Sequence, residues 1–193
     1  MPHCTEDLQL RVKWGSEQMA EKSNTKLADI KLLVLDVDGV LTDGTVIINP
    51  DGSESKGFNV FDGHGIRMWK RAGLKVAFLS GRLSQPTKLR AQQLGVDYCI
   101  QDCRDKLSAI KKLLEQLGIG AEETAFIGDD LMDLQAIKYV GFGAAVANAV
   151  DEIKQYADYV TDLPGGKGAV REVIEYILKS NGKWQVLVKK YMP

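Results

Sequence analysis

Short apolar runs alternate with helical patterns through most of this 193-residue chain, and several of the runs lead into acidic or hydroxyl residues. An apolar run of three to five residues between polar segments is typical of a buried strand. Six runs have this character: Leu32–Leu35, Val76–Leu79, Tyr98–Ile100, Ala125–Ile127, Gly143–Val146 and Asp158–Val160. Strands that alternate with helices predict an α/β fold, a doubly wound Rossmann-like parallel sheet with helices on both faces. Ligands of such sheets bind at the carboxyl ends of the strands.

One segment departs from this alternation. Thr45–Ile48 has the composition of a strand, residues 49–52 (Asn-Pro-Asp-Gly) that of a turn, and Ser53–Val60 that of a second strand. We therefore expect a β-hairpin flap near residues 45–60 that projects over the carboxyl edge of the sheet. The remaining sequence leaves no room for a large capping domain, so we expect none. Because a two-stranded hairpin is marginal alone, we expect neighbouring subunits to cover its apolar stretch.

Composition limits the class of protein. The chain is 45% hydrophobic and 26% charged with a formal net charge of −1, which suits one globular domain and disfavours a nucleic-acid partner. No apolar run approaches the roughly 18 residues of a membrane span, and the first 29 residues lack the apolar stretch of a secretion signal. Three cysteines suit a reducing cytoplasm.

The chain divides into three expected regions. Residues 1–29 form a polar N-terminal extension, residues 30–181 the core with its hairpin, and residues 182–193 a C-terminal tail. Trp184, Leu187 and Tyr191 give the tail an apolar character. It either reaches the site of a neighbouring subunit or packs or frays on its own subunit.

The first apolar run leads into a motif with two carboxylates. Asp36 and Asp38 stand two residues apart in a loop that leaves a predicted strand, so both can approach one ligand. One can attack phosphorus while the other handles the proton of the leaving group. A solvated acidic turn is the simpler alternative, but four apolar residues deliver these acids to a sheet edge. A calcium loop is excluded, because Val40, Leu41 and Ile47 stand where that loop needs an acid, a glycine and a glutamate.

The run Gly128–Asp133 supplies further carboxylates at the same predicted edge. Hard oxygen ligands beside phosphate chemistry favour Mg²⁺, and we assign Asp129 as the ligand. Asp133 is better explained as a structural residue or as an acid favoured by a helix N-terminus.

Two more segments supply groups that could hold a phosphate. Ser80, Gly81 and Arg82 follow a predicted strand, where a hydroxyl and backbone amides can bind phosphate oxygens. A serine at that place is otherwise an ordinary helix cap. Lys106 opens a predicted helix, where a cation opposes the helix dipole. Neutralising a phosphate would explain it, and a solvated surface lysine is the alternative.

Taken in order, these segments resemble the four motifs of haloacid dehalogenase-like phosphatases. Residues 36–42 are similar to the first motif, Ser80 to the second, Lys106 to the third and residues 128–133 to the fourth. Four further segments resemble the family of 3-deoxy-D-manno-octulosonate 8-phosphate (KDO 8-phosphate) phosphatases, with a likeness that covers roughly residues 30–182: Asp43-Gly44, Phe58–Gly63, Ser80–Arg82 and Gly165–Glu172.

The resemblance implies a mechanism. Asp36 would be the nucleophile that forms an aspartyl-phosphate, and Asp38 would act as acid and then as base. The Asp36 carboxylate, the Asp38 main-chain carbonyl and the Asp129 carboxylate would hold Mg²⁺. Ser80 and Lys106 would hold the phosphoryl oxygens.

The resemblance also implies a substrate and an assembly. Gly81 and Arg82 would contact a small phosphorylated sugar acid, KDO 8-phosphate, whose hydrolysis supplies lipopolysaccharide precursor synthesis. Phe61 stands where some members carry a basic residue, so another sugar-acid phosphate, such as a nonulosonate 9-phosphate, is the alternative. The implied assembly is a homotetramer of cap-less subunits. Residues 165–168 either approach the substrate or form a flexible turn.

Two other classes of protein carry similar residues. Receiver domains combine paired acids, a hydroxyl residue and a lysine, but their adjacent acid pair lies on the first strand. Here the first-strand acids are spaced as Asp36 and Asp38, and the adjacent pair Asp129-Asp130 comes late. A non-catalytic scaffold of this fold would not need the complete set of motif residues. A nucleotide-hydrolysing P-loop enzyme is disfavoured, because its glycine-rich motif is absent from the sequence.

Overall fold

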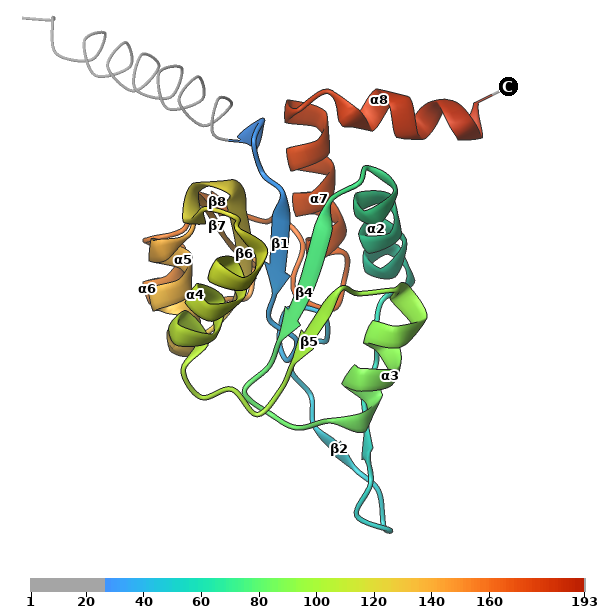
Figure 1. Cartoon of the computed structure of the whole chain (residues 1–193). Helices are drawn as coiled ribbons and strands as arrows, with labels where there is room; N and C mark the ends of the chain where they lie inside the picture. The colour runs from blue at the N-terminus through green and yellow to red at the C-terminus, as the bar shows by residue number, and fades with distance from the viewer. Residues whose placement is uncertain (1–26, 193) are drawn as a thin grey trace, which may run out of the picture.

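The structure, a computed structural model, describes residues 27–192 and confirms the α/β fold with one parallel sheet (Figure 1). All six predicted strands form, and each is parallel to its neighbours. Their order across the sheet is β5-β4-β1-β6-β7-β8. The strands are β1 (Leu32–Leu35), β4 (Lys75–Leu79), β5 (Tyr98–Ile100), β6 (Thr124–Gly128), β7 (Phe142–Ala145) and β8 (Tyr159–Val160).

The strand order places a switch point at the centre of the sheet. From β1 the chain moves outward through β4 and β5, then returns to β6 on the other side of β1 and continues outward through β7 and β8. Ligands of open α/β sheets bind at such a point, outside the carboxyl ends of the strands. The residues that follow β1, β4 and β6 therefore meet at the binding edge.

Helices connect the strands and cover both faces of the sheet (Figure 1). The helices are α2 (Val60–Arg71), α3 (Gln85–Leu94), α4 (Lys106–Leu117), α5 (Leu134–Tyr139), α6 (Asp151–Lys154), α7 (Ala169–Ser180) and α8 (Lys183–Val188). Three short 3₁₀ turns, Ala121–Glu123, Leu131–Asp133 and Lys189–Tyr191, complete the structure. Within residues 27–192 every helix is too short or too polar to cross a membrane.

The core forms where β1 packs between the helix layers. All four residues of β1 are buried, as are six residues of α7 on one face of that helix. Burying one such aliphatic side chain contributes about 1.5–3 kcal/mol, so the central strand is held firmly. Leu27 is also fully buried, which means that packing begins before the residue 30 boundary expected from the sequence. The rest of the expected polar extension, residues 1–26, lies outside the described residues.

The expected hairpin consists of β2 (Ile47–Ile48) and β3 (Glu54–Ser55), which are antiparallel, and it projects past the carboxyl edge of the sheet (Figure 1). Its second strand is shorter than predicted. The strand ends at Ser55, and Val60 belongs to α2 because the side chain of Asn59 caps that helix by accepting a hydrogen bond from the Phe61 amide. Within the described residues the hairpin is the sole insertion between β1 and α2, so no capping domain is present there.

The C-terminal tail packs on its own chain, at the end of the sheet opposite the hairpin (Figure 1). Leu187 in α8 is buried. The Trp184 ring lies 5.2 Å from both the Arg171 guanidinium carbon and the Lys179 amine, and the Tyr191 hydroxyl accepts a hydrogen bond from Arg71. Part of the tail therefore packs on its own subunit, and its reach to the site of a neighbouring subunit stays a prediction.

Candidate active site

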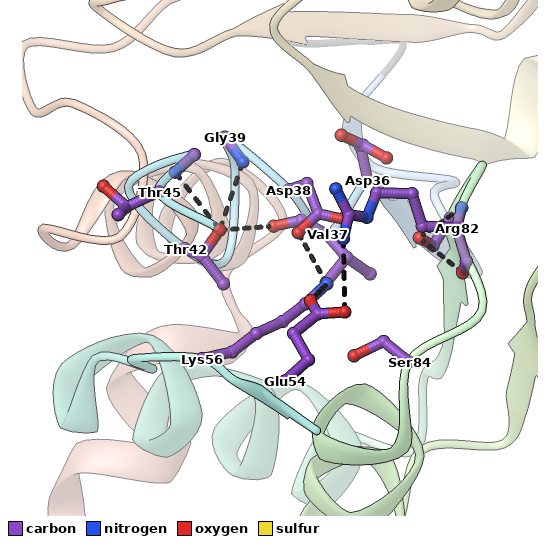
Figure 2. A network of polar contacts seen from close by, with 12 residues as sticks. Asp36, Val37, Asp38, Gly39, Thr42, Thr45, Glu54, Lys56, Arg82 and Ser84 are labelled. Carbon is purple, nitrogen blue, oxygen red and sulfur yellow. Dashed lines mark hydrogen bonds and ion pairs between the residues drawn. The ribbon is translucent and has the colours of Figure 1, made fainter. Parts of the chain in front are cut away.

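The loop that follows β1 is a tight turn closed by the Thr42 hydroxyl. Its oxygen accepts hydrogen bonds from the amides of Gly39 and Gly44, each at 3.3 Å, and donates to the Val37 carbonyl (Figure 2). Gly39 has a φ of 93°, and a side chain there would lie 2.0 Å from a carboxylate oxygen of Asp129. Glycine is therefore required at this position on two counts, conformation and space. The close approach brings the first motif against the fourth.

Four charged side chains form a buried cluster at the carboxyl edge of the sheet: Asp36, Lys106, Asp129 and Asp133. Carboxylate oxygens of the three aspartates lie within 4.8 Å of one another. The Lys106 amine donates to Asp36 Oδ1 at 2.7 Å and to Asp133 Oδ1 at 2.5 Å. Lys106 does open α4, as predicted, but it is buried, so the alternative of a solvated surface lysine is wrong.

Asp133 uses both of its oxygens within the protein. Oδ1 accepts from Lys106, and Oδ2 accepts from the amides of Asp129 and Asp130 at 3.0 and 3.4 Å. Its side chain is almost fully buried and packs against Gly128, where a side chain would lie 2.5 Å from the Asp133 Cβ. These contacts agree with the expected structural role, since Asp133 aligns Lys106 and fixes the turn that carries Asp129.

Burial and like charges shape the electrostatics of this cluster. Burial, followed by the charge of Asp133, raises the pKa of Asp36 well above its usual range, although Lys106 opposes the shift. The same two causes raise the pKa of Asp129 to about 6. Burial would lower the pKa of Lys106, but its ion pairs with Asp36 and Asp133 outweigh burial and raise it. Three anions and one cation at a buried site leave an excess of negative charge.

The cluster fits a divalent cation of the hard type. Asp36 and Asp129 offer carboxylate oxygens, which Mg²⁺ prefers, while the third acid is occupied by internal hydrogen bonds. The raised pKa values of Asp36 and Asp129 express the cost of keeping these anions close together and dry, which a bound cation would offset.

Ser80 follows β4 at the same edge. The register that pairs Leu35 with Phe78 brings Ser80 to the level of Val37, one residue after Asp36. Ser80 is buried, and its hydroxyl accepts from the Arg82 amide and donates to the Arg82 carbonyl, both at 3.1 Å. Gly81 lies in this turn, with the Cys103 carbonyl 3.6 Å from where a Cβ would be. The hydroxyl is thus held by the local turn rather than by the buried cluster.

A second group of charges joins the hairpin to the site, and we call it the hairpin network: Asp38, Lys56, Glu54 and Arg82 (Figure 2). The Lys56 amine lies 2.5 Å from Asp38 Oδ1 and 3.4 Å from Glu54 Oε1. Arg82 Nη2 donates to Glu54 Oε2 at 3.2 Å. Sequence reasoning missed Lys56 and Glu54. The available signal was their spacing, because opposite charges two residues apart on a strand point to the same side.

Residues 165–168 press against the first motif. A side chain at Gly165 would lie 1.7 Å from the Gly39 carbonyl oxygen, and the Gly166 amide donates to the Val40 carbonyl at 2.9 Å. The segment ends at α7, where buried Asp62 of α2 accepts from the amides of Gly168 and Arg171. The sequence left this segment as either a substrate contact or a flexible turn. In the structure it is a brace for the loop that carries Asp36 and Asp38.

The fold and this site define a phosphatase of the haloacid dehalogenase-like class. Its marks are two acids after β1, a hydroxyl after β4, a buried lysine at the start of α4 and an aspartate after β6. The model of the haloacid dehalogenase-like hydrolase family matches residues 100–174. The 3-deoxy-D-manno-octulosonate 8-phosphate phosphatase of Salmonella typhi is 44% identical over 159 residues, which are 82% of this chain and 85% of that protein. The chain belongs to the family of KDO 8-phosphate phosphatases.

Solved structures of relatives agree with this assignment. The Moraxella catarrhalis phosphatase, in complex with magnesium ion, phosphate ion and KDO, is 41% identical and superposes with a TM-score of 0.87 over 89% of this chain and 98% of that one. The cobalt-bound phosphatase of Haemophilus influenzae is 43% identical, with a TM-score of 0.81 over 83% and 94% of the two chains. The family relationship removes the receiver domain as an alternative.

Proposed function

We propose that this chain hydrolyses KDO 8-phosphate to KDO and phosphate through an aspartyl-phosphate on Asp36. The observation that carries the proposal is the arrangement of Asp36. It lies at the switch point of the sheet, paired at 2.7 Å with a buried lysine and beside Asp129, while Asp38 follows two residues later. The substrate assignment is supported by the family and by the KDO bound in the relative from Moraxella catarrhalis.

In the first half of the reaction, an oxygen of the Asp36 carboxylate attacks phosphorus while the bond from phosphorus to the sugar oxygen breaks. Asp38, in its protonated form, passes its proton to that departing oxygen, so the sugar acid leaves as an alcohol. Lys106 and the Ser80 hydroxyl hold the oxygens of the transferring phosphoryl group. Positioning of this kind and charge stabilisation supply most of the rate in phosphoryl transfer.

In the second half, the Asp38 carboxylate takes a proton from water as the water oxygen attacks phosphorus. The bond between phosphorus and Asp36 breaks, which releases phosphate and restores both aspartates. Asp36, Asp129 and the Asp38 carbonyl would hold Mg²⁺, which when bound offsets the repulsion between anionic nucleophile and anionic phosphate. Asp133 keeps Lys106 aligned through both steps.

The exposed side of the site, formed by Arg82 and the hairpin, supports the expected substrate specificity and assembly. Arg82 is exposed and beside the hairpin, so it and Gly81 are the groups that would meet the carboxylate end of a sugar acid. The hairpin leaves Val46, Ile47 and Ile48 exposed. Covering these apolar residues with neighbouring subunits would stabilise the hairpin and wall the site, and this supports a homotetramer. The low number of cysteines supports a cytoplasmic location.

A substrate panel tests the proposal. The purified protein is assayed for phosphate release from KDO 8-phosphate, a nonulosonate 9-phosphate and common hexose phosphates, with Mg²⁺ and after exhaustive chelation. We expect the highest kcat/KM for KDO 8-phosphate and loss of activity on chelation, restored by Mg²⁺. Preference for another sugar-acid phosphate would reassign the substrate, and activity that survives chelation would remove the metal from the mechanism.

A further inference from the structure

Lys56 is a buried lysine that the proposed chemistry does not use. It follows β3 on the hairpin, 18 residues after Asp38, yet its amine lies 2.5 Å from Asp38 Oδ1. Only 1% of its side chain is exposed, against 23% for Asp38. A buried ammonium is costly unless it is paired. The hairpin therefore places this charge where ion pairs with Asp38 and Glu54 offset the cost of burying it.

The lysine is held in place from its other side. Glu54 Oε1 lies 3.4 Å from the Lys56 amine, and Glu54 Oε2 accepts from Arg82, so opposite charges alternate along the whole network. Lys56 comes directly after β3 and lies on the same side of the hairpin as Glu54, whereas Ser55 between them bonds to Asn49. Lys56 therefore lies between two carboxylates, and its hydrogen bond goes to Asp38.

We propose that Lys56 is a positioning residue for Asp38, which makes the hairpin part of the catalytic machinery. By holding Oδ1, the lysine fixes the orientation of the carboxyl group and leaves Oδ2 free to face the leaving group. The inference rests on the proposed function of Asp38 as acid and base. In the first half-reaction the proton on Oδ2 passes to the departing sugar oxygen as the bond from that oxygen to phosphorus breaks.

The competing explanation is that the ion pair simply anchors the hairpin. The two explanations differ in how the effect depends on the leaving group. A sugar alkoxide needs a proton as it leaves, whereas p-nitrophenolate is stable without one, so only the first needs a well-aimed acid. A structural defect would slow both substrates equally.

The test compares Lys56→Met with wild type in single-turnover release of the leaving group, using KDO 8-phosphate and p-nitrophenyl phosphate. Single turnover isolates the first half-reaction, which comes before the water step common to both substrates. We expect a loss of roughly 10- to 100-fold for the sugar phosphate, a part of the usual general-acid contribution, and a loss below about threefold for the aryl phosphate. Lys56→Arg should restore most of the sugar-phosphate rate, because it returns a donor to Oδ1.

A matched control is available on α2. Lys70 pairs with Asp97 Oδ1 at the same 2.5 Å, away from the buried cluster and the hairpin network, so Lys70→Met should leave both substrates unaffected. If circular dichroism shows that Lys56→Met does not fold, Glu54→Gln is tested instead, because it removes one ion pair of Lys56. This variant should also lose more activity on the sugar phosphate than on the aryl phosphate, by a smaller factor. Equal losses on both substrates, or none, would overturn the inference. A wild-type protein inactive on every sugar-acid phosphate would instead overturn the proposed function.

Discussion

The two halves of the active site are built in different ways. The buried cluster comes from the ends of β1 and β6, from the start of α4 and from the turn before α5, and it is held by short bonds to Lys106 and to backbone amides. The hairpin network comes from a two-stranded flap and from the loops after β1 and β4, and the exposed fraction of its side chains rises from 1% at Lys56 to 45% at Arg82. The first half is mostly buried, and the second becomes more exposed toward Arg82.

This difference separates the chemistry common to all phosphate esters from the steps that depend on the leaving group. Reactions shared by a whole superfamily need the same buried charges, and strand ends in a packed sheet position them without help from the substrate. The hairpin side is more exposed, and in the proposed function it would meet the variable part of the substrate. Substitutions in the buried cluster should therefore affect every substrate alike, while substitutions in the hairpin network should discriminate among substrates.

The largest effect should follow Asp36→Asn. Asparagine keeps the shape of the side chain but is a poor nucleophile and a weaker metal ligand, so kcat should fall on the order of 10⁴-fold or more on every phosphate ester. Phosphate release is measured at saturating substrate, with circular dichroism as the check on folding. A folded variant with near wild-type kcat would contradict the covalent mechanism.

Asp38→Asn should have the second largest effect. Asp38 lies in the same loop as Asp36 and also pairs with Lys56 of the hairpin network. Both half-reactions lose their proton carrier, so kcat on a sugar phosphate should fall by about 10²–10⁴. Rapid-quench measurements should show slower release of both the sugar and the phosphate. If only one of the two releases slows, a single residue does not serve as both acid and base.

Asp133→Asn should have a moderate effect confined to the buried cluster. The variant weakens the hold on Lys106 and on the turn that bears Asp129, and supporting residues of this kind typically contribute about 10- to 100-fold to metal affinity or activity. Activity is titrated against Mg²⁺ concentration. Asp130→Asn is the matched control, because Asp130 is exposed and its side chain caps the same turn without contacting Lys106. Equal losses in the two variants would show that the effect is general to the turn.

Deleting residues 183–193 should have the smallest effect on catalysis. The deletion removes the buried side chain of Leu187 and the contacts of Trp184 with α7, and burial of one such side chain is worth about 1.5–3 kcal/mol. The melting temperature should therefore fall while KM for KDO 8-phosphate stays close to wild type. A changed KM with an unchanged melting temperature would instead place the tail in the site of a neighbouring subunit.

The sequence predicted the buried half of the site better than the open half. Asp36, Ser80 and Asp129 each follow a strand that could be located by its apolar run, and the parallel sheet then determines where they meet. Lys56 carried no such marker, since its partner Asp38 lies across a turn whose geometry cannot be derived from local patterns. The end of β3 was misjudged for the same reason, because Asn59 begins α2 through a cap that outweighs the extended pattern around it.

The brace formed by residues 165–168 has a consequence for biosynthesis. The loop that carries the first two aspartates is closed against Gly165 and Gly166, which the ribosome adds some 130 residues after Asp36. During synthesis of the intervening chain, β1 can pair with β4 and later with β6, but its loop lacks the backbone against which it rests. A nascent chain that has not yet released this glycine segment carries all four aspartates of the site and yet lacks the finished shape of the loop. We therefore expect competence for turnover to be acquired only after residues 165–168 have joined the fold.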